Sequence, residues 1–330
     1  MARLLLFNPE HDYALAHGGP YYMPPVSVRN IALHLQFIPL IWSRKGDFIL
    51  GADNEIFNSE DLSQISLNEC YPFIDKIIPW GWDAATRFRL ESIGFAKSLL
   101  PGLDFLDMVR RLSHRRISIK CNEYLDSPLI PKEIFNVNEA EEFVASHPGC
   151  YFKLPWSSGG RGVLATAELN SDQIREWILG ALRRQGSVMA EPFINRVIDF
   201  SSLWKISESQ TFFEGLSISL SDGRGKYKGN LFGPQVEIFN YVKKNCDKKI
   251  SPILKRQKEF IGQYISPYYQ GEMGIDMIIG QDKEIYPCVE INLRRTMGHV
   301  ALNYNKFLKT GKILPLKMSL PLINIKTVGL

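Results

Sequence analysis

The chain has 330 residues, of which 45% are hydrophobic and 22% are charged. This length and balance predict a folded protein with two or three packed subdomains, and they exclude a largely disordered chain. The formal net charge of +4 is too small for the dense basic surface of a nucleic-acid-binding protein, so we expect no nucleic-acid partner.

No segment predicts export or a membrane span. The first residues hold one arginine and only a short apolar run, unlike a signal peptide. No stretch approaches the roughly 20 apolar residues that a membrane helix needs. The five cysteines form no CxxC pair, so we expect neither a disulfide framework nor a structural zinc site. These features predict a cytoplasmic protein with reduced thiols and no membrane partner.

In the first third of the chain, predicted strands alternate with predicted helices. Strands are expected at residues 3–7, 38–42, 47–50 and 77–78. Helices are expected at residues 27–37 and from an N-cap at Asp83 to a stop near Gly94. This alternation predicts a small, Rossmann-like parallel α/β domain over residues 1–112.

Residues 113–330 show a different pattern, with longer strands close together. Helices are expected near Ser113 and at residues 139–146, 174–182 and 253–265. Strands are expected at residues 129–131, 151–153, 188–193, 211–220, 227–232, 274–279 and 285–291. The sequence Asp222-Gly223-Arg224-Gly225 predicts a hairpin turn between two of these strands.

A glycine-rich segment follows the strand that ends at Lys153. Its small and polar residues are Ser157, Ser158, Gly159, Gly160 and Gly162. Glycine lets backbone N–H groups approach an anion closely, serine hydroxyls add donors, and lysine supplies a positive charge. The pattern is neither a Walker loop nor a Rossmann fingerprint. By itself it is more typical of a glycine-rich hairpin turn.

Two late strands carry oxygen ligands. Glu290 and Asn292 lie two residues apart on one strand and therefore face the same side. If the preceding strand pairs with it in the antiparallel sense, Asp276 faces the same space. Such hard oxygen ligands suit Mg²⁺. The alternative is a solvated hairpin face with ordinary polar residues.

Arg294 and Arg295 come directly after these ligands, and His299 follows. An arginine beside a metal site can hold a phosphoryl group or a carboxylate through two hydrogen bonds. A pair of surface arginines is the alternative, and a packed, hydrogen-bonded role is the more common one for a histidine such as His299.

Together these segments resemble the ATP-grasp superfamily. The shared order is a lysine, a Ser-Ser-Gly-Gly-x-Gly loop, an apolar strand ending in Glu-Pro-Phe, a late aspartate and Glu-x-Asn-x-Arg. The resemblance covers residues 112–303 and implies an ATP-grasp domain over residues 113–330. Within it we expect a glycine-loop lobe at about 151–192 and a metal-site lobe at about 193–330.

The resemblance also implies roles for individual residues. Lys153 and the loop residues Ser157, Ser158, Gly159, Gly160 and Gly162 correspond to positions that bind the phosphates of ATP. Glu191 and Phe193 correspond to the adenine-binding strand, and Asp199 to the carboxylate that holds the ribose. Asp276, Glu290 and Asn292 correspond to the Mg²⁺ ligands. Arg294, Lys153 and Arg295 are the expected catalytic cations.

Two segments depart from the family pattern. The family often has an early lysine where this chain has Ser113-His114-Arg115-Arg116, so Arg115 would replace it as an ATP-binding cation. Arginine keeps the charge of lysine but has a different shape. Residues 226–241 match no family motif.

The implied function is an ATP- and Mg²⁺-dependent carboxylate–amine ligase with small-molecule carboxylate and amine substrates. The resemblance implies an acyl phosphate intermediate, with positioning and electrostatics as the enzyme's contribution. Three alternatives stay open: a phosphotransferase of the same fold, a nucleotide-binding protein without turnover, and an unrelated α/β binding protein. The identities of the acid and of the nucleophile stay open as well. The oligomeric state is also open, and a homodimer is one possibility.

The loop after the first strand is a candidate for choosing the substrate. It holds Glu10, His11 and Asp12, and loops at the carboxyl ends of parallel strands often line ligand crevices. A capped and hydrogen-bonded turn is the alternative for each of these residues.

Overall fold

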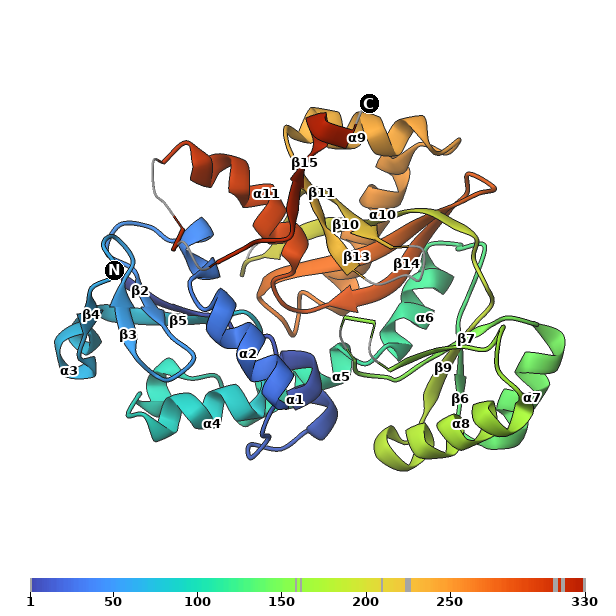
Figure 1. The fold of residues 1–330 in the computed structure, drawn as a ribbon, viewed down its shortest axis with the longest axis horizontal. Coiled ribbons are helices and arrows are strands. Elements are labelled where there is room, and N and C mark those ends of the chain that lie inside the picture. Colours follow the sequence, from blue (N-terminus) through green and yellow to red (C-terminus); the bar gives the residue numbers. More distant parts are fainter. Residues whose placement is uncertain are drawn as a thin grey trace.

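The computed structural model describes residues 2–157, 159–160, 162–208, 210–222, 227–310, 314–315 and 318–328. In this described part of the chain the strands form three sheets, with the N-terminal sheet at one end of the molecule and a small sheet at the other (Figure 1). A larger sheet lies between them. None of the described helices is both long enough and apolar enough to cross a membrane.

The N-terminal sheet has five strands in the order β4-β3-β2-β1-β5. As predicted, β1 (Ala2–Leu6) pairs in parallel with β2 (Phe48–Leu50) and β5 (Ile74–Pro79). The short strands β3 (Ile56–Asn58) and β4 (Gln64–Ile65) extend it in the antiparallel sense, which makes the sheet mixed.

Helices connect these strands or follow the last of them. They are α1 (His11–His17), α2 (Val26–Leu35), α3 (Leu67–Cys70), α4 (Ala84–Ser92) and α5 (Leu103–Leu112), with short 3-10 helices at η2 (Tyr71–Phe73) and η3 (Lys97–Leu99). The predicted N-cap is confirmed, because the Asp83 side chain accepts a hydrogen bond from the Thr86 amide at 2.8 Å.

The strand predicted at residues 38–42 is wrong. This segment is the 3-10 helix η1 (Ile38–Trp42), with a proline in its first turn, where the missing N–H of proline is tolerated. Its apolar side chains are buried against the late helix α11 (Met297–Leu308) and against Phe7 and Trp80, in one hydrophobic cluster. The segment is apolar because it packs against a distant helix, and in the sequence this apolar run resembled a buried strand.

The glycine-loop lobe contains a four-stranded antiparallel sheet in the order β6-β9-β7-β8. Its strands are β6 (Lys132–Ile134), β7 (Tyr151–Lys153), β8 (Val163–Ala165) and β9 (Val188–Glu191), covered by α7 (Val137–Ser146) and α8 (Ser171–Gln185). The strand predicted at 129–131 is displaced: β6 begins after Pro131, which has no N–H to donate to a neighbouring strand. This sheet therefore begins before residue 151, the start predicted for the lobe. Helix α6 (Arg116–Tyr124) precedes it.

The central sheet has six strands in the order β14-β13-β10-β11-β12-β15. They are β10 (Arg196–Ile206), β11 (Thr211–Ser221), β12 (Tyr227–Phe232), β13 (Gly271–Gly280), β14 (Ile285–Asn292) and β15 (Leu322–Asn324), which leads into η4 (Ile325–Val328). The antiparallel pairing of β11 with β12 agrees with the predicted hairpin, but residues 223–225 of its turn lie outside the described residues.

The two faces of the central sheet differ in chemistry because side chains alternate along each strand. Ile198 and Phe200 of β10 pack in one cluster with α9 (Gln235–Lys244) and α10 (Ile250–Tyr264). Asp199 and Ser201 lie on the opposite face. This second face is polar, and α11 covers part of it.

A buried polar cluster joins the ends of β1 and β5 and fixes the start of α1. The Asn8 side-chain amide donates to the Gly81 carbonyl at 2.8 Å and to the Thr86 hydroxyl at 2.8 Å. His11 Nδ1 lies 3.0 Å from the Asp83 carboxylate, and the His11 side chain is 1% exposed. His11 is therefore a packed, hydrogen-bonded residue that holds α1 in place.

We expect Gly81→Ala to lower the free energy of unfolding by about 1–3 kcal/mol, a typical cost of overpacking. A Cβ at this position would lie 2.6 Å from the His11 ring, and the ring is locked by Asp83. Denaturant unfolding checks the value. The matched control is Gly262→Ala in α10, where a Cβ meets open space and alanine favours the helix. Equal stability of the two variants would contradict the steric argument.

Candidate functional site

Strands β13 and β14 bring the three predicted metal ligands together. They pair in the antiparallel sense, as expected, with Asp276 opposite Glu290 and Gly274 opposite Asn292. The Asn292 amide nitrogen donates to Asp276 Oδ2 at 3.0 Å. On the neighbouring strand β10, the Ser201 hydroxyl donates to Asp276 Oδ1 at 2.6 Å. Sequence reasoning missed Ser201, although the polar–apolar alternation of β10 places it on this face.

The electrostatics of this group fit a cation. Burial and then the charge of Glu290 raise the pKa of Asp276 to about 6, against the hydrogen bonds from Ser201 and Asn292 and the charge of Arg294. Two carboxylates this close repel each other, and a divalent cation would relieve that repulsion. Among the described residues no three Asp, Glu, His or Cys side chains form a metal cluster. Two carboxylates and an amide are nevertheless a donor set that suits Mg²⁺ when phosphates supply further oxygens.

Arg115 connects this carboxylate pair to the glycine-loop lobe. It is buried at the start of α6, and its Nη2 donates to Glu290 Oε1 at 2.8 Å. Its Nη1 donates to the Ser157 hydroxyl at 2.8 Å and also to the Leu154 carbonyl. One guanidinium therefore holds the first serine of the glycine segment beside a predicted metal ligand.

The glycine segment has the backbone that its sequence requires. Gly159, Gly160 and Gly162 have φ values of 62°, 75° and 77°, in the left-handed region that favours glycine. A Cβ on Gly162 would lie 2.8 Å from the Leu154 side chain, whereas Gly159 and Gly160 are exposed. Ser158 lies outside the described residues.

The other predicted ATP-binding residues lie on β7, on β9, in the connection after β9 and on β10 of the central sheet. Lys153 of β7 forms an ion pair with Glu191 of the adjacent strand β9, and both side chains are mostly buried. The rings of Tyr151 and Phe193 stack with centroids 6.0 Å apart. Asp199 lies on the Ser201 face of β10, 3.5 Å from an Arg196 nitrogen.

Arg294 and Arg295 extend in different directions. Arg294 binds the Asp12 carboxylate through Nε at 3.0 Å and Nη2 at 2.7 Å, and so links the metal-site lobe to α1. Burial by itself would lower the pKa of Arg294. The negative charges of Asp12, Glu290 and Asp276 outweigh this effect and hold the pKa above its usual value. Arg295 instead pairs with Glu272 at 2.5 Å and lies over the Trp42 ring at 4.6 Å. Of these two arginines, Arg294 is therefore the one that lies beside the carboxylate pair.

The raised pKa of Asp276 predicts a pH-dependent stability. The folded state binds the Asp276 proton more tightly than the unfolded chain, in which the pKa of an aspartate is 3.8. The stabilisation that comes from this protonation is therefore complete below pH 3.8 and is lost as the pH rises through 6. Relative to Asp276→Asn, we expect the wild type to lose about 3 kcal/mol of unfolding free energy across this window. Denaturant unfolding at several pH values without divalent cations measures this. The exposed control Asp104→Asn should follow the wild type, and parallel curves for all three proteins would contradict the prediction.

Arg115→Lys should release the glycine segment. A lysine ammonium cannot contact both Ser157 and Glu290 in the geometry of the guanidinium fork. We expect faster hydrogen–deuterium exchange at Gly159, Gly160 and Gly162 and a stability loss of about 1–3 kcal/mol. Arg116→Lys is the control, since Arg116 is half exposed and pairs with Glu133 instead. Equal exchange in the two variants would show that Arg115 does not hold the glycine segment in place.

Comparison with known proteins identifies the fold. No family model and no curated protein sequence matches the chain. Among solved structures, a Campylobacter jejuni biotin carboxylase–βγ-ATP complex matches with a TM-score of 0.53 and 12% identity, covering 96% of this chain and 72% of that one. A second match is the biotin carboxylase domain of Hydrogenobacter thermophilus 2-oxoglutarate carboxylase, solved with MgADP, ADP and bicarbonate. Its TM-score is 0.51 at 12% identity, and the match covers 96% of this chain and 71% of that one. A third match is Staphylococcus aureus N5-carboxyaminoimidazole synthetase in complex with ADP, with a TM-score of 0.50 and 12% identity. This match covers 95% of this chain and 78% of that one. The chain therefore has the ATP-grasp fold, as its motifs predicted.

Proposed function

We propose that this protein is an ATP- and Mg²⁺-dependent ligase that activates a substrate carboxylate as an acyl phosphate for attack by an amine. The observation that carries the proposal is the half-buried pair of Asp276 and Glu290, which face each other across β13 and β14 with Arg115 and Arg294 beside them. Similarity of fold to proteins solved with ATP, ADP or MgADP supports a nucleotide as the ligand.

In this proposal the nucleotide lies between the two sheets of residues 113–330. Lys153, Ser157 and the glycine segment hold its phosphates through a positive charge, a hydroxyl and backbone N–H groups. The Lys153–Glu191 ion pair supports this placement, because it fixes the lysine next to the strand proposed to contact adenine. Phe193 offers a ring face to the base, and Asp199 offers a carboxylate to the ribose hydroxyls.

Asp276, Glu290 and Asn292 would hold Mg²⁺, which when bound neutralises charge on the terminal phosphates. Arg294 is oriented by Asp12 and keeps N–H donors on both Nη atoms for a transferring phosphoryl oxygen. Its charge stabilises the negative oxygens of the transition state. Arg295, which the sequence suggested as a further catalytic cation, lies against Glu272 and Trp42, so we assign the catalytic role to Arg294 and Lys153.

The reaction has two steps. A substrate carboxylate oxygen bonds to the γ-phosphorus of ATP as the bond to the β-phosphate oxygen breaks, which gives an acyl phosphate and ADP. The amine nitrogen then bonds to the carbonyl carbon, inorganic phosphate leaves, and the nitrogen loses a proton to give the amide.

Hydroxylamine provides a test that does not require the natural amine. It attacks an acyl phosphate to give a stable hydroxamate and phosphate. With ATP, Mg²⁺ and a panel of amino acids and dicarboxylates, we expect ADP and a hydroxamate in equal amounts. A phospho-product that resists hydroxylamine would instead identify a phosphotransferase.

Glu290→Gln tests the site itself. The variant keeps the size of the side chain but loses the charge needed for Mg²⁺, so we expect at least about a 100-fold loss of turnover, or about 2.7 kcal/mol. Mg²⁺-dependent stabilisation by ATP, measured by thermal unfolding, should be lost in parallel. The control is Glu259→Gln on the exposed side of α10. A wild type that no nucleotide stabilises would overturn the proposal.

A further inference from the structure

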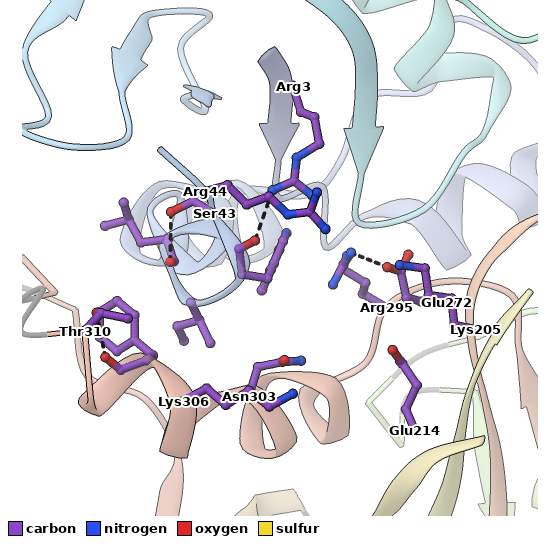
Figure 2. Close-up of a pocket in the computed structure, with 14 residues that line it drawn as sticks. Arg3, Ser43, Arg44, Lys205, Glu214, Glu272, Arg295, Asn303, Lys306 and Thr310 are labelled. Carbon is purple, nitrogen blue, oxygen red and sulfur yellow. Dashed lines mark hydrogen bonds and ion pairs between the residues drawn. The ribbon is translucent and has the colours of Figure 1, made fainter. Parts of the chain in front are cut away.

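A second polar pocket lies on the central sheet, apart from the carboxylate pair. Its volume is about 390 Å³, within the range of small-molecule sites. It is bounded by η1 and Arg3 of the N-terminal domain, by the strands β10, β11 and β13, and by α11 (Figure 2). The ligase mechanism proposed above uses none of the side chains that line it.

Helix α11 separates this pocket from the proposed magnesium site. In the register of β13 and β10, Glu272 lies opposite Lys205 and Asp276 lies opposite Ser201. Glu272 and Asp276 are four residues apart on β13, which is about 13 Å along a strand. Between them Gly274 lies under the start of α11, because a Cβ at this glycine would be 3.5 Å from the Thr296 side chain. The same polar face is thus divided into two compartments.

The buried floor of the pocket is an arginine with unused hydrogen-bonding capacity. Arg295 is 6% exposed, and its Nη2 is held by Glu272 at 2.5 Å. Its Nε has no hydrogen-bond partner among the described residues, although it is buried. A buried, unsatisfied donor on a charged group is costly, and an anion held in the pocket would offset part of that cost through its charge.

The charges in the pocket are not balanced. Arg3 is paired with Asp47 and Arg295 with Glu272. The remaining charged lining residues are three cations, Arg44, Lys205 and Lys306, and a single carboxylate, Glu214. In Figure 2, Glu214 and Glu272 lie toward one side of the pocket, and Arg44 and Lys306 toward the other. The distribution favours a ligand with more negative than positive charge and with its charges separated.

Glu214 gives the pocket a position for a cationic group. Burial and then the charge of Glu272 raise the pKa of this carboxyl, against the charges of Lys205, Arg295 and Lys306. The neighbouring His299 does not compensate it: its Nε2 is 3.9 Å away, beyond hydrogen-bond reach, and burial lowers the pKa of His299 to about 3, so the ring is neutral. The Thr296 amide donates to His299 Nδ1, which leaves the proton on Nε2.

We propose that this pocket binds an acidic α-amino acid, with its ammonium group at Glu214 and its carboxylates at Arg44 and Lys306, within reach of the charge of Arg295. The volume suits a molecule of this size, and the one extra negative charge of the ligand offsets part of the cationic excess. The site goes beyond the proposed ligase reaction and does not depend on it.

Calorimetric titration of the full chain without nucleotide tests this binding, so that its result is independent of ATP turnover. The probes are L-glutamate and L-aspartate, with glutarate and succinate as analogues that lack the amine. We expect at least one amino acid to bind, and its deaminated analogue to bind at least about tenfold more weakly, which is about 1.4 kcal/mol.

Matched variants locate the ligand. Arg44→Gln, Lys306→Gln and Glu214→Gln should each weaken binding about tenfold, whereas the controls Lys45→Gln, Lys309→Gln and Glu208→Gln, which alter exposed neighbours outside the pocket, should not. Circular dichroism checks folding, and the three pocket variants allow a conclusion even if one of them fails to fold. Absence of binding by both amino acids at millimolar concentration, equal binding by the diacids, or binding that no pocket variant weakens would overturn the inference.

Discussion

The antiparallel pairing of β10, β13 and β14 is the constraint on which the rest of the structure depends. Because side chains alternate along a strand, this register directs Ile198, Phe200 and Met277 toward α9 and α10, and it directs Ser201, Asp276 and Glu290 to the opposite face. A slip of one residue would bury the carboxylates in the apolar layer and expose its core. The hydrophobic core therefore fixes the positions of the polar groups, and the chemistry of the site follows from packing on the other side of the sheet.

The cost of placing Asp276 beside Glu290 is shared among distant segments of the chain. Ser201 and Asn292 donate hydrogen bonds to Asp276, Arg115 reaches Glu290 from α6, and Arg294 adds its charge nearby. The raised pKa of Asp276 shows that these contacts do not balance the site completely. A preorganised group of charges that the neighbouring arginines do not fully balance is suited to a metal–nucleotide complex, because the cation supplies further positive charge.

Helix α11 has two structural roles. Its apolar residues Val300 and Phe307 join η1 and Trp80 in one cluster, which attaches the N-terminal domain to the central sheet. Its first turn lies on the polar face between Asp276 and Glu272, where Gly274 and Gly298 leave room for the close approach. Arg294 and Arg295, which directly precede this helix, consequently lie in two different environments, one beside the carboxylate pair and one in the second pocket.

By itself the sequence determined the fold class and the local geometry of the site. Glu290 and Asn292 share a face because they are two residues apart, glycines mark the left-handed positions at 159, 160 and 162, and Asp83 caps its helix. These features depend on the nearest neighbours in the chain or on one strand pairing. The tertiary structure alone decided that residues 38–42 form a 3-10 helix, that Asp12 orients Arg294, and that Arg295 turns away toward Glu272. Each of these outcomes rests on a contact between residues far apart in the chain, and local periodicity contains no information about which distant side chain will be the partner.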